Sequence, residues 1–374
     1  MDERAYWVAF NRVKGIGAVR VRALLDFFGS LEQAWQASFA ALRSAGLPEK
    51  VAASVLEMRR SLDLERELEK VQQAGVTLLT WQDEAYPRLL REIAQPPPVL
   101  YVRGELLDED DWAAALVGTR RVTAYGRQVT ADVAAYLGAH AVTVVSGLAR
   151  GVDAIAHDAA LKAGGRTIAV LGSGVDRIYP PEHEHLAARI AEAGAVVSDY
   201  ALGTPPDAAN FPPRNRIISG LARVVVVIEA SDNSGAMITA AFAADQNRDV
   251  LAVPGGIYAP QSKGTNLLIQ RGARPLLHPG DVLEAMDMDP GQMQAQRSAR
   301  QVLPVNDLEG QILQTLSAEP LHIDEIGQKT GLPMDQVAAA LTMMELKGMA
   351  RAVGGMNYIL AREGSGDYQV KPNG

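Results

Sequence analysis

Short apolar runs alternate with helix-length segments between residues 113 and 253. The runs fall at Ala113–Val117, Val142–Val145, Thr167–Leu171, Ala195–Val197, Arg223–Ile228 and Val250–Val253. Helical periodicity between them predicts helices near Tyr125–Leu137, Val152–Ala163, Glu182–Ala193, Arg214–Leu221 and Gly235–Gln246. Continuous runs of Val, Ile, Leu and Ala joined by helical crossovers are typical of parallel strands buried on both faces. The pattern predicts a doubly wound, mostly parallel α/β sheet, in which ligands bind at loops after the strand C-termini.

Before the sheet, residues 1–75 have the pattern of small helices. Helices at Tyr6–Val13 and Val19–Phe28 flank Gly15-Ile16-Gly17, and Ala45-Gly46-Leu47-Pro48 leads into a later helix at Glu49–Arg60. This unit of helix, turn and helix occurs twice. It resembles the helix-hairpin-helix (SAM-like) module, whose turn amides hold a DNA phosphate. A helical bundle with glycine caps explains the same pattern and is slightly favoured. Residues 62–73 predict a charged helix, and strands are expected at Val76–Trp81 and Val99–Val102.

The C-terminal region has the pattern of a winged helix. Helices are expected at Asp307–Ser317, His322–Thr330 and Met334–Lys347, with a two-stranded wing at Ala350–Val353 and Asn357–Leu360. The expected recognition helix is apolar and acidic, whereas a helix that reads DNA displays Arg, Lys, Asn or Gln. A protein-contact or supporting role is therefore at least as well supported as base readout. The predicted domains are a helical domain at 1–75, the sheet domain at 76–287, a linker at 288–305, the winged helix at 306–361 and a flexible tail at 362–374.

Composition narrows the class of protein. The chain has 374 residues, 48% of them hydrophobic, and no apolar run near the roughly 20 residues of a membrane helix. The N-terminus lacks the features of a signal peptide, so a cytoplasmic protein without a membrane partner is expected. The absence of cysteine excludes disulfides and thiolate catalysis. A net charge of −8 argues against a surface that coats nucleic acid everywhere, but it permits a local basic groove.

Two strand-end loops predict anion contacts. The strand ending at Val117 is followed by Gly118-Thr119-Arg120-Arg121, and the strand ending at Val145 is followed by Ser146-Gly147 and then Arg150. Small residues let backbone amides approach an anion, and arginines add charge-assisted hydrogen bonds. Consecutive residues point in different directions, so only one of Arg120 and Arg121 is expected to face the ligand. Asp153 fits a helix cap, and His157 fits a structural role, better than either fits catalysis.

The stretch Asp199–Gly220 predicts the centre of the site. A loop ends in Phe211-Pro212-Pro213, and a helix is expected to start with Arg214, Asn215 and Arg216 in its first turn. Unsatisfied amides at a helix N-terminus, with two arginines and an amide side chain, suit phosphate. Phe211 is an aromatic on which a base stacks. Thr239 and Lys263, at the starts of later helices, add donors.

The loops lack the residues of the common catalytic and cofactor sites. Gly172-Ser173-Gly174 begins like a dinucleotide fingerprint, but Arg177 stands in place of the third glycine, so no nicotinamide cofactor is expected. No loop carries a Ser-His-Asp set, a metal-ligand cluster or a Walker-type phosphate loop. Many phosphate-holding groups without reactive groups predict a protein that binds a polyanion and has no cofactor or enzymatic activity.

These motifs resemble the DNA-processing protein A family (DprA, also called Smf). The resemblance rests on motifs in the same order: Gly118-Thr119-Arg120-Arg121, Ser146 to Asp153, Thr167 to Gly172, Phe211 to Gly220, Ser234-Gly235 with Thr239-Ala240, and Pro254-Gly255. It implies an extended Rossmann fold that binds single-stranded DNA, protects the incoming strand and loads the recombinase RecA in natural transformation, commonly as a homodimer. Carried over by motif, the DNA-binding residues are Gly118, Thr119, Arg120, Ser146, Gly147, Phe211, Arg214, Asn215, Arg216 and Thr239. Arg166 takes a position that is often Lys in the family.

Other readings remain open at this point. A nucleotide-monophosphate hydrolase of the lysine-decarboxylase-like (LOG) type needs Pro-Gly-Gly-x-Gly-Thr-x-x-Glu. Here Pro254-Gly255-Gly256 lies seven residues before Gly264-Thr265, and no glutamate follows at the required spacing. A sequence-specific transcription factor is disfavoured by the acidic recognition helix. The end domains leave double-stranded DNA open as a second partner, and Leu267-Leu268-Ile269 is a candidate for the dimer face.

Overall fold

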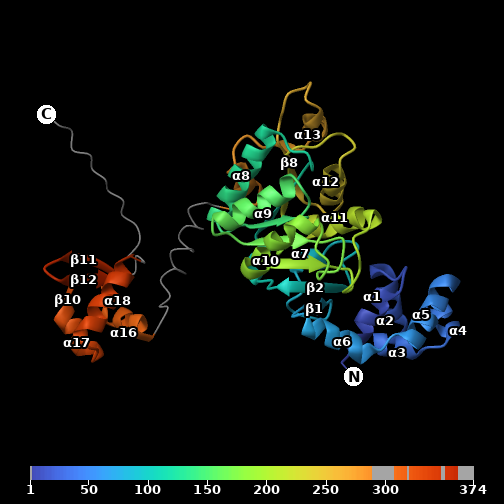
Figure 1. Ribbon diagram of the computed structural model, residues 1–374, viewed down its shortest axis with the longest axis horizontal. Helices are drawn as coiled ribbons and strands as arrows, with labels where there is room; N and C mark the ends of the chain where they lie inside the picture. The colour runs from blue at the N-terminus through green and yellow to red at the C-terminus, as the bar shows by residue number, and fades with distance from the viewer. Residues whose placement is uncertain (1, 289–306, 318–319, 347–349, 361–374) are drawn as a thin grey trace. The chain divides into compact units, whose positions relative to one another are not determined.

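The computed structural model describes residues 2–288, 307–317, 320–346 and 350–360. The chain forms two compact units, Met1–Asp287 and Met288–Gly374 (Figure 1). The helices of residues 1–75 therefore belong to the same unit as the sheet. The predicted linker, apart from Met288, and the predicted tail lie outside the described residues.

The first unit is built on a nine-stranded sheet, in the order β1-β2-β6-β5-β4-β3-β7-β8-β9. Neighbouring strands pair in parallel along β6-β5-β4-β3-β7-β8-β9. At one edge, β2 pairs with β6 and β1 pairs with β2, both antiparallel. The strands are β1 (Thr77–Thr80), β2 (Val99–Gly104), β3 (Ala113–Val117), β4 (Thr143–Ser146), β5 (Thr167–Val170), β6 (Ala195–Ser198), β7 (Val224–Val227), β8 (Asp249–Ala252) and β9 (Arg274–Pro275).

This sheet confirms the predicted fold class. Each of the six strands predicted between residues 113 and 253 lies within one residue of its expected ends. Strand β3 is buried along its whole length, as expected for a parallel strand covered on both faces. The short edge strand β9 was not predicted, because two residues carry no periodic signal.

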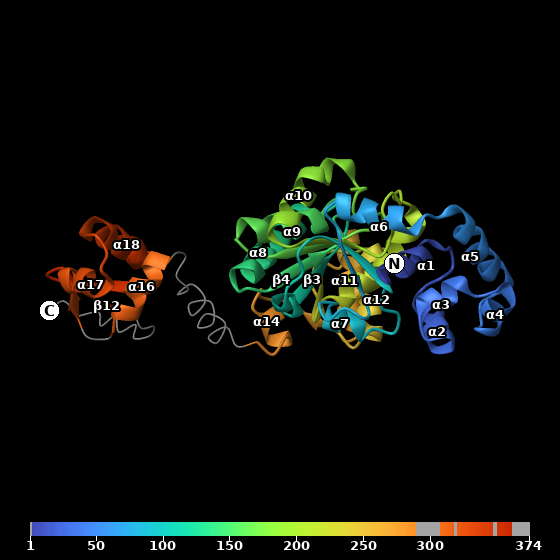
Figure 2. The same cartoon turned by 90° about the horizontal axis from the view of Figure 1, so that it is seen from below.

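Two layers of helices cover the sheet. Figure 2 shows α8, α9 and α10 on one side of the strands and α7, α12 and α14 on the other. The helices are α7 (Arg88–Arg91), α8 (Ala124–Ala139), α9 (Val152–Lys162), α10 (Glu184–Ala193), α11 (Phe211–Gly220), α12 (Gly235–Asp245), α13 (Lys263–Gln270) and α14 (Asp281–Ala285). The layers bury separate apolar cores, one around Ala187 and Ile190 and one around Ile217, Ile218 and Ala240.

The order of the strands creates a switch point in the middle of the sheet. The chain runs outward from β3 through β4 and β5 to β6, then crosses back to β7, which pairs with the other side of β3. The loops after β3 and β7 therefore leave in opposite directions and open a crevice at the carboxyl ends of these strands.

The N-terminal helices pack onto the antiparallel edge of the sheet. They are α1 (Arg4–Arg12), α2 (Ala18–Phe28), α3 (Leu31–Gln36), α4 (Phe39–Ser44), α5 (Glu49–Ser61) and α6 (Leu64–Gln73). Trp7, Phe10 and Trp35 are buried in a core that continues into the sheet at Tyr101. The short helices α3 and α4 were not predicted, although Ser30 and Ser38 cap them through their hydroxyls.

The second unit is a winged helix, as predicted. It contains α16 (Asp307–Thr315), α17 (Ile323–Thr330) and α18 (Met334–Leu346), with β11 (Ala350–Gly354) and β12 (Asn357–Leu360) as the wing. A third strand, β10 (Leu321–His322), pairs with β12 and was not predicted. Ile312, Ile326, Val337 and Leu341 are fully buried between the helices. Across the described residues of both units, every helix is too short or too polar to span a membrane.

Candidate nucleic-acid interface

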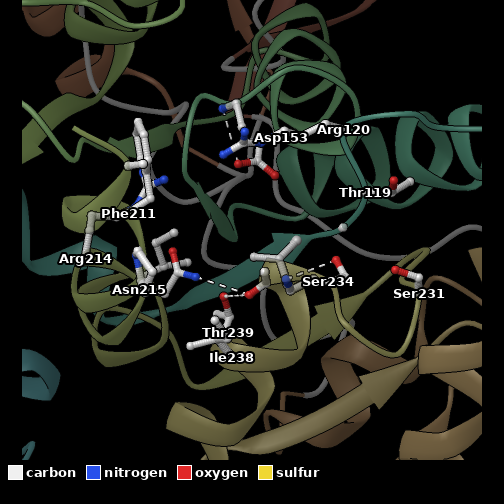
Figure 3. Close-up of a pocket in the computed structure, with 18 of the residues that line it drawn as sticks. Thr119, Arg120, Asp153, Phe211, Arg214, Asn215, Ser231, Ser234, Ile238 and Thr239 are labelled. Carbon is white, nitrogen blue, oxygen red and sulfur yellow. Dashed lines mark hydrogen bonds between the residues drawn. The ribbon is translucent and has the colours of Figure 1, made fainter. Parts of the chain in front are cut away.

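A pocket of the first unit lies at the switch point, beyond the carboxyl ends of β3 and β7. Its volume is about 670 Å³. Figure 3 shows Phe211 and Arg214 on one side of it and Ser231 and Ser234 on the other. The pocket gathers eight of the predicted site residues, namely Gly118, Thr119, Arg120, Arg121, Phe211, Arg214, Asn215 and Thr239.

Arg120 and Arg121 are the exposed cations of this pocket. Both follow β3, and neither side chain has an acidic partner among the described residues. The guanidinium carbon of Arg120 lies 5.6 Å from the centre of the Phe211 ring, a cation–π contact. Within the described part of the chain, these charges therefore have no acid to pair with and are available to an anionic ligand.

Glu229, two residues after the end of β7, holds the arginine loop in place. Its main-chain oxygen accepts a hydrogen bond from the Thr119 amide at 2.7 Å, and its buried carboxylate accepts from the Thr123 amide at 2.9 Å. The carboxylate also accepts from the Thr123 hydroxyl. Glu229 thus occupies the start of α8, where an anionic ligand binds in many doubly wound folds. It was not predicted, although a lone acid at the end of a buried strand was a usable signal.

Arg214 differs from its predicted role. Helix α11 begins at Phe211, three residues earlier than expected, so Pro212 and Pro213 occupy its first turn and supply no N–H groups. The predicted anion site on free amides at Arg214 is therefore wrong. The Arg214 side chain is only 4% exposed and donates to the main-chain oxygens of Gly147, at 2.9 Å, and Val170. Burial lowers the pKa of Arg214 to about 10.

The loop after β4 packs closely against Arg214. A Cβ atom at Gly147 would lie 2.7 Å from the Arg214 guanidinium, so any larger residue there would displace this group from its hydrogen bonds. The Asp153 carboxylate, in the first turn of α9, accepts from the loop amides of Gly147 at 3.1 Å and Ala149 at 3.3 Å, so it holds the loop after β4 and does not cap the helix as predicted. Burial raises the pKa of Asp153. The Ser146 hydroxyl donates to the Leu116 oxygen at 2.6 Å, so it is buried behind the pocket.

His157 lies deeper, below this loop. It is fully buried, and its Nδ1 is 2.6 Å from the Thr167 hydroxyl oxygen. Burial lowers the pKa of His157 to about 3, so the imidazole is neutral at neutral pH. The predicted structural role agrees with this position, because the ring does not reach the pocket lining.

The opposite wall supplies neutral groups. The Asn215 amide nitrogen donates to the Gly235 oxygen at 3.2 Å, and the Thr239 hydroxyl lies 3.5 Å from the same oxygen. Ser234 caps α12 by accepting from the Ala236 amide at 3.3 Å. The pocket is therefore basic and aromatic on one side and polar but uncharged on the other.

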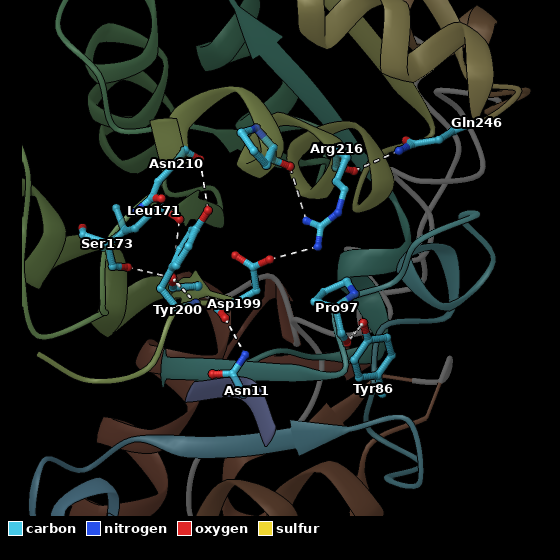
Figure 4. A network of polar contacts seen from close by, with 12 residues as sticks. Asn11, Tyr86, Pro97, Leu171, Ser173, Asp199, Tyr200, Asn210, Arg216 and Gln246 are labelled. Carbon is cyan, nitrogen blue, oxygen red and sulfur yellow. Dashed lines mark hydrogen bonds and ion pairs between the residues drawn. The ribbon is translucent and has the colours of Figure 1, made fainter. Parts of the chain in front are cut away.

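Arg216, Arg150 and Lys263 lie outside this pocket. Arg216 forms an ion pair with Asp199 at 2.9 Å (Figure 4) and lines a second pocket of about 470 Å³ beside the Gly15–Gly17 turn. Arg150 pairs with Glu182 at 2.5 Å and, with Gly147, lines a small cavity that adjoins the main pocket. Lys263 is exposed at the start of α13.

Arg166 does not belong with these residues, and its prediction as part of the same groove is wrong. It directly precedes β5 and therefore lies at the amino ends of the parallel strands, the edge opposite the pocket. Its guanidinium donates to both carboxylate oxygens of Asp110, at 3.0 and 2.9 Å, and to the Glu105 oxygen at 2.9 Å. Arg166 was included because the family often has a lysine at this position, and its place before a strand had already suggested the rim of the groove and not its centre.

Comparisons with known proteins show the family of the chain. Residues 77–287 match the family described as DNA recombination-mediator protein A, and residues 293–356 match the DprA winged helix domain. Protein Smf of Synechocystis is 37% identical, with 96% of this chain and 98% of that protein covered. The X-ray structure of DNA processing protein A from Streptococcus pneumoniae superposes with a TM-score of 0.66 at 33% identity, covering 76% of this chain and 97% of that one.

The description of a second solved structure names single-stranded DNA as what that protein binds. It is DNA processing protein A from Helicobacter pylori, described for its single-stranded DNA binding mode. It superposes with a TM-score of 0.51 at 30% identity and covers 56% of this chain and 95% of that one.

Proposed function

Because the chain belongs to the DNA recombination-mediator protein A family, we propose that it binds single-stranded DNA in the pocket at the carboxyl ends of β3 and β7. The observation that carries this proposal is the pair of uncompensated arginines, Arg120 and Arg121, beside an aromatic wall. Phosphates bind to these guanidinium groups, and bases lie against the rings. The description of the Helicobacter pylori relative supports the same ligand.

The neutral wall of the pocket favours binding without sequence preference. Ser231, Asn215 and Thr239 line it, and the hydrogen bonds of Asn215 and Thr239 are directed to the Gly235 oxygen. Few of these groups are free to read base edges, so affinity comes from charge and stacking. We propose that the protein has no catalytic activity of its own, because Asp153 and Glu229 are engaged with backbone amides.

At the level of biological role, we propose a mediator that protects incoming single strands and loads RecA during natural transformation, in the cytoplasm. We also propose a homodimer formed through the first unit. Leu267 and Ile269, the earlier candidates for the dimer face, are half-buried, whereas Ile257, Tyr258 and Leu277 nearby in sequence are more than 70% exposed. Such exposed apolar side chains support association. The proposed loading of RecA is tested separately, by measuring RecA-driven strand exchange on DNA that is covered by a single-strand binding protein.

The DNA-binding proposal is tested by fluorescence anisotropy with a labelled thymidine 20-mer and a duplex of the same length, across a range of salt concentrations. We expect the single strand to bind more tightly, with affinity falling as salt rises. Arg120→Ala weakens binding about tenfold and reduces the salt slope by about 0.7, the value for one phosphate on a single strand. Its thermal unfolding is unchanged, because Arg120 is exposed.

Arg127→Ala is the matched control. Arg127 is also an exposed arginine, in the first turns of α8, but it does not line the pocket. Its substitution leaves affinity and salt slope unchanged. Equal losses for Arg120→Ala and Arg127→Ala would remove the pocket from the proposal, and a salt-independent wild-type affinity would contradict the phosphate contacts.

A further inference from the structure

Tyr179 is an aromatic residue of the pocket that the motif pattern did not identify. It lies on the loop between β5 and α10, far from Phe211 in sequence, and its ring centre is 5.8 Å from that of Phe211, at an interplanar angle of 36°. Its ring lines both the main pocket and the small cavity beside Gly147. Tyr179 is 38% exposed.

Contacts on both sides of Tyr179 fix the loop that carries it. Before it, the Ser173 hydroxyl donates to the Arg177 oxygen at 2.7 Å. After it, His183 Nδ1 lies 2.8 Å from the Leu148 oxygen, and Glu182 accepts from Arg150 at 2.5 Å. The first contact braces the loop internally and the other two fasten it to the segment after β4, so the loop holds the ring against Phe211 before any ligand binds. A group held in place this way loses little conformational entropy on binding.

Phe211, in contrast, is enclosed by its neighbours. The guanidinium carbons of Arg120 and Arg214 lie 5.6 and 5.9 Å from the centre of its ring. On the protein side, Gly172 lies against the ring edge, where an added Cβ would be 2.9 Å from Cδ1 of Phe211. Tyr179 contacts it as well. The more exposed aromatic surface of the pocket therefore belongs to Tyr179, while Phe211 supports the two guanidinium groups.

We propose that Tyr179 is the platform on which a base of the bound strand stacks, an assignment that rests on the proposed single-stranded DNA binding. Phe211 orients the arginine that holds the adjacent phosphate. Stacking on an aromatic ring tolerates any base, because every base has a π-face. The Tyr179 hydroxyl has no hydrogen-bond partner among the described residues, so the ring alone carries this role.

The test separates base contacts from phosphate contacts. Two oligomers of equal length are used, a thymidine strand and an abasic phosphodiester strand without bases, with the full chain as Tyr179→Ala, Tyr179→Phe and Phe211→Ala. Tyr179→Ala is expected to lose about tenfold in affinity for the thymidine strand and nothing for the abasic strand. Tyr179→Phe keeps both affinities. Phe211→Ala loses affinity for both strands, because Arg120 loses its support.

The control is Tyr125→Ala, since Tyr125 is also an exposed tyrosine at this edge of the sheet but does not line the pocket. It leaves both affinities unchanged. Equal weakening on both strands by Tyr179→Ala, or no weakening on either, overturns the stacking role. Thermal unfolding of each variant shows whether an equal loss comes from misfolding, which also counts against a platform role. Failure of the wild-type protein to bind any single strand refutes the proposed function itself, a result distinct from these.

Discussion

The two edges of the parallel sheet both carry arginines, but they use them differently. At the amino ends of the strands, Arg166 binds Asp110, and Arg223 donates to the Asp111 oxygen at 2.7 Å and stacks on Trp112 at 3.8 Å. Arg248, just before β8, donates to the Leu89 oxygen at 2.9 Å. At the carboxyl ends, Arg120 and Arg121 have no such partner among the described residues.

The difference lies in what the acids bind. At the amino-end edge, the Asp110 carboxylate pairs with an arginine side chain. At the carboxyl-end edge, Asp199 and Glu182 also pair with arginines, but Asp153 and Glu229, the acids beside the arginine loop of the pocket, accept hydrogen bonds from backbone amides. Their carboxylates hold loop amides, which leaves the nearby exposed arginines without an acidic partner among the described residues. An arginine therefore indicates a ligand site when the local acids are already occupied, and its mere presence near a strand does not.

The largest effect is expected at Arg214. Unlike Arg120 and Arg121, its guanidinium is buried and donates to main-chain oxygens, as arginines of the opposite edge do. Arg214→Ala removes a buried donor from the Gly147 and Val170 oxygens and leaves a cavity. We expect it to lower the free energy of unfolding by about 3 kcal/mol and also to weaken DNA binding. Urea denaturation and anisotropy titration measure the two effects.

Arg214→Lys is the informative companion variant. It keeps the charge, but an ammonium group cannot reproduce the planar contact with two separate carbonyl groups. It should therefore lose most of the stability that Arg214→Ala loses. Full stability with reduced DNA binding in either variant would mean that Arg214 acts as a free ligand-binding cation, and the contrast between the edges would fail.

Arg166 tests the opposite edge. Arg166→Met leaves the Asp110 carboxylate, whose side chain is only 9% exposed, without its cation. We expect a loss of about 2 kcal/mol in the free energy of unfolding and no change in DNA affinity. Arg189→Met is the control, because it breaks an ion pair with Asp158 that is about half exposed and contributes little. Weaker DNA binding by Arg166→Met at unchanged stability would restore Arg166 to the DNA-binding surface.

These residues also mark how far the sequence allowed prediction. Runs such as Ala113–Val117 predicted buried parallel strands, because continuous apolar residues have no other stable location. The strand ends then located the loop of Arg120 correctly. Helix α11 was placed too late, because Pro212 and Pro213 suggested a loop, although proline is well tolerated in the first turn of a helix.

Contacts between distant segments could not be predicted. Tyr179 meets Phe211, and Arg166 meets Asp110, only after the strands have assembled. The sequence reports periodicity and residue type, whereas the pairing of a charge depends on side chains from other elements. Arg216 illustrates this: it is only two residues from Arg214, but its guanidinium is paired with Asp199 and lines a different pocket.

Arg121 gives the smallest expected effect and sharpens the contrast within the pocket itself. Arg120 rests on the Phe211 ring, whereas Arg121 has no ring contact and no ion pair among the described residues. Its exposed side chain must be ordered when DNA binds, and this entropy cost reduces its net contribution. Arg121→Ala is therefore expected to weaken binding of the thymidine strand about threefold, less than Arg120→Ala, with unchanged unfolding.

The double variant Arg120→Ala with Arg121→Ala shows whether the two cations act independently. If each holds its own phosphate, the losses in binding free energy add, since neither guanidinium depends on the other. If Arg121→Ala alone costs as much as Arg120→Ala, then the contact with Phe211 does not preorganise Arg120. In that case net charge at the carboxyl-end edge, and not the placement of one arginine against a ring, determines the affinity.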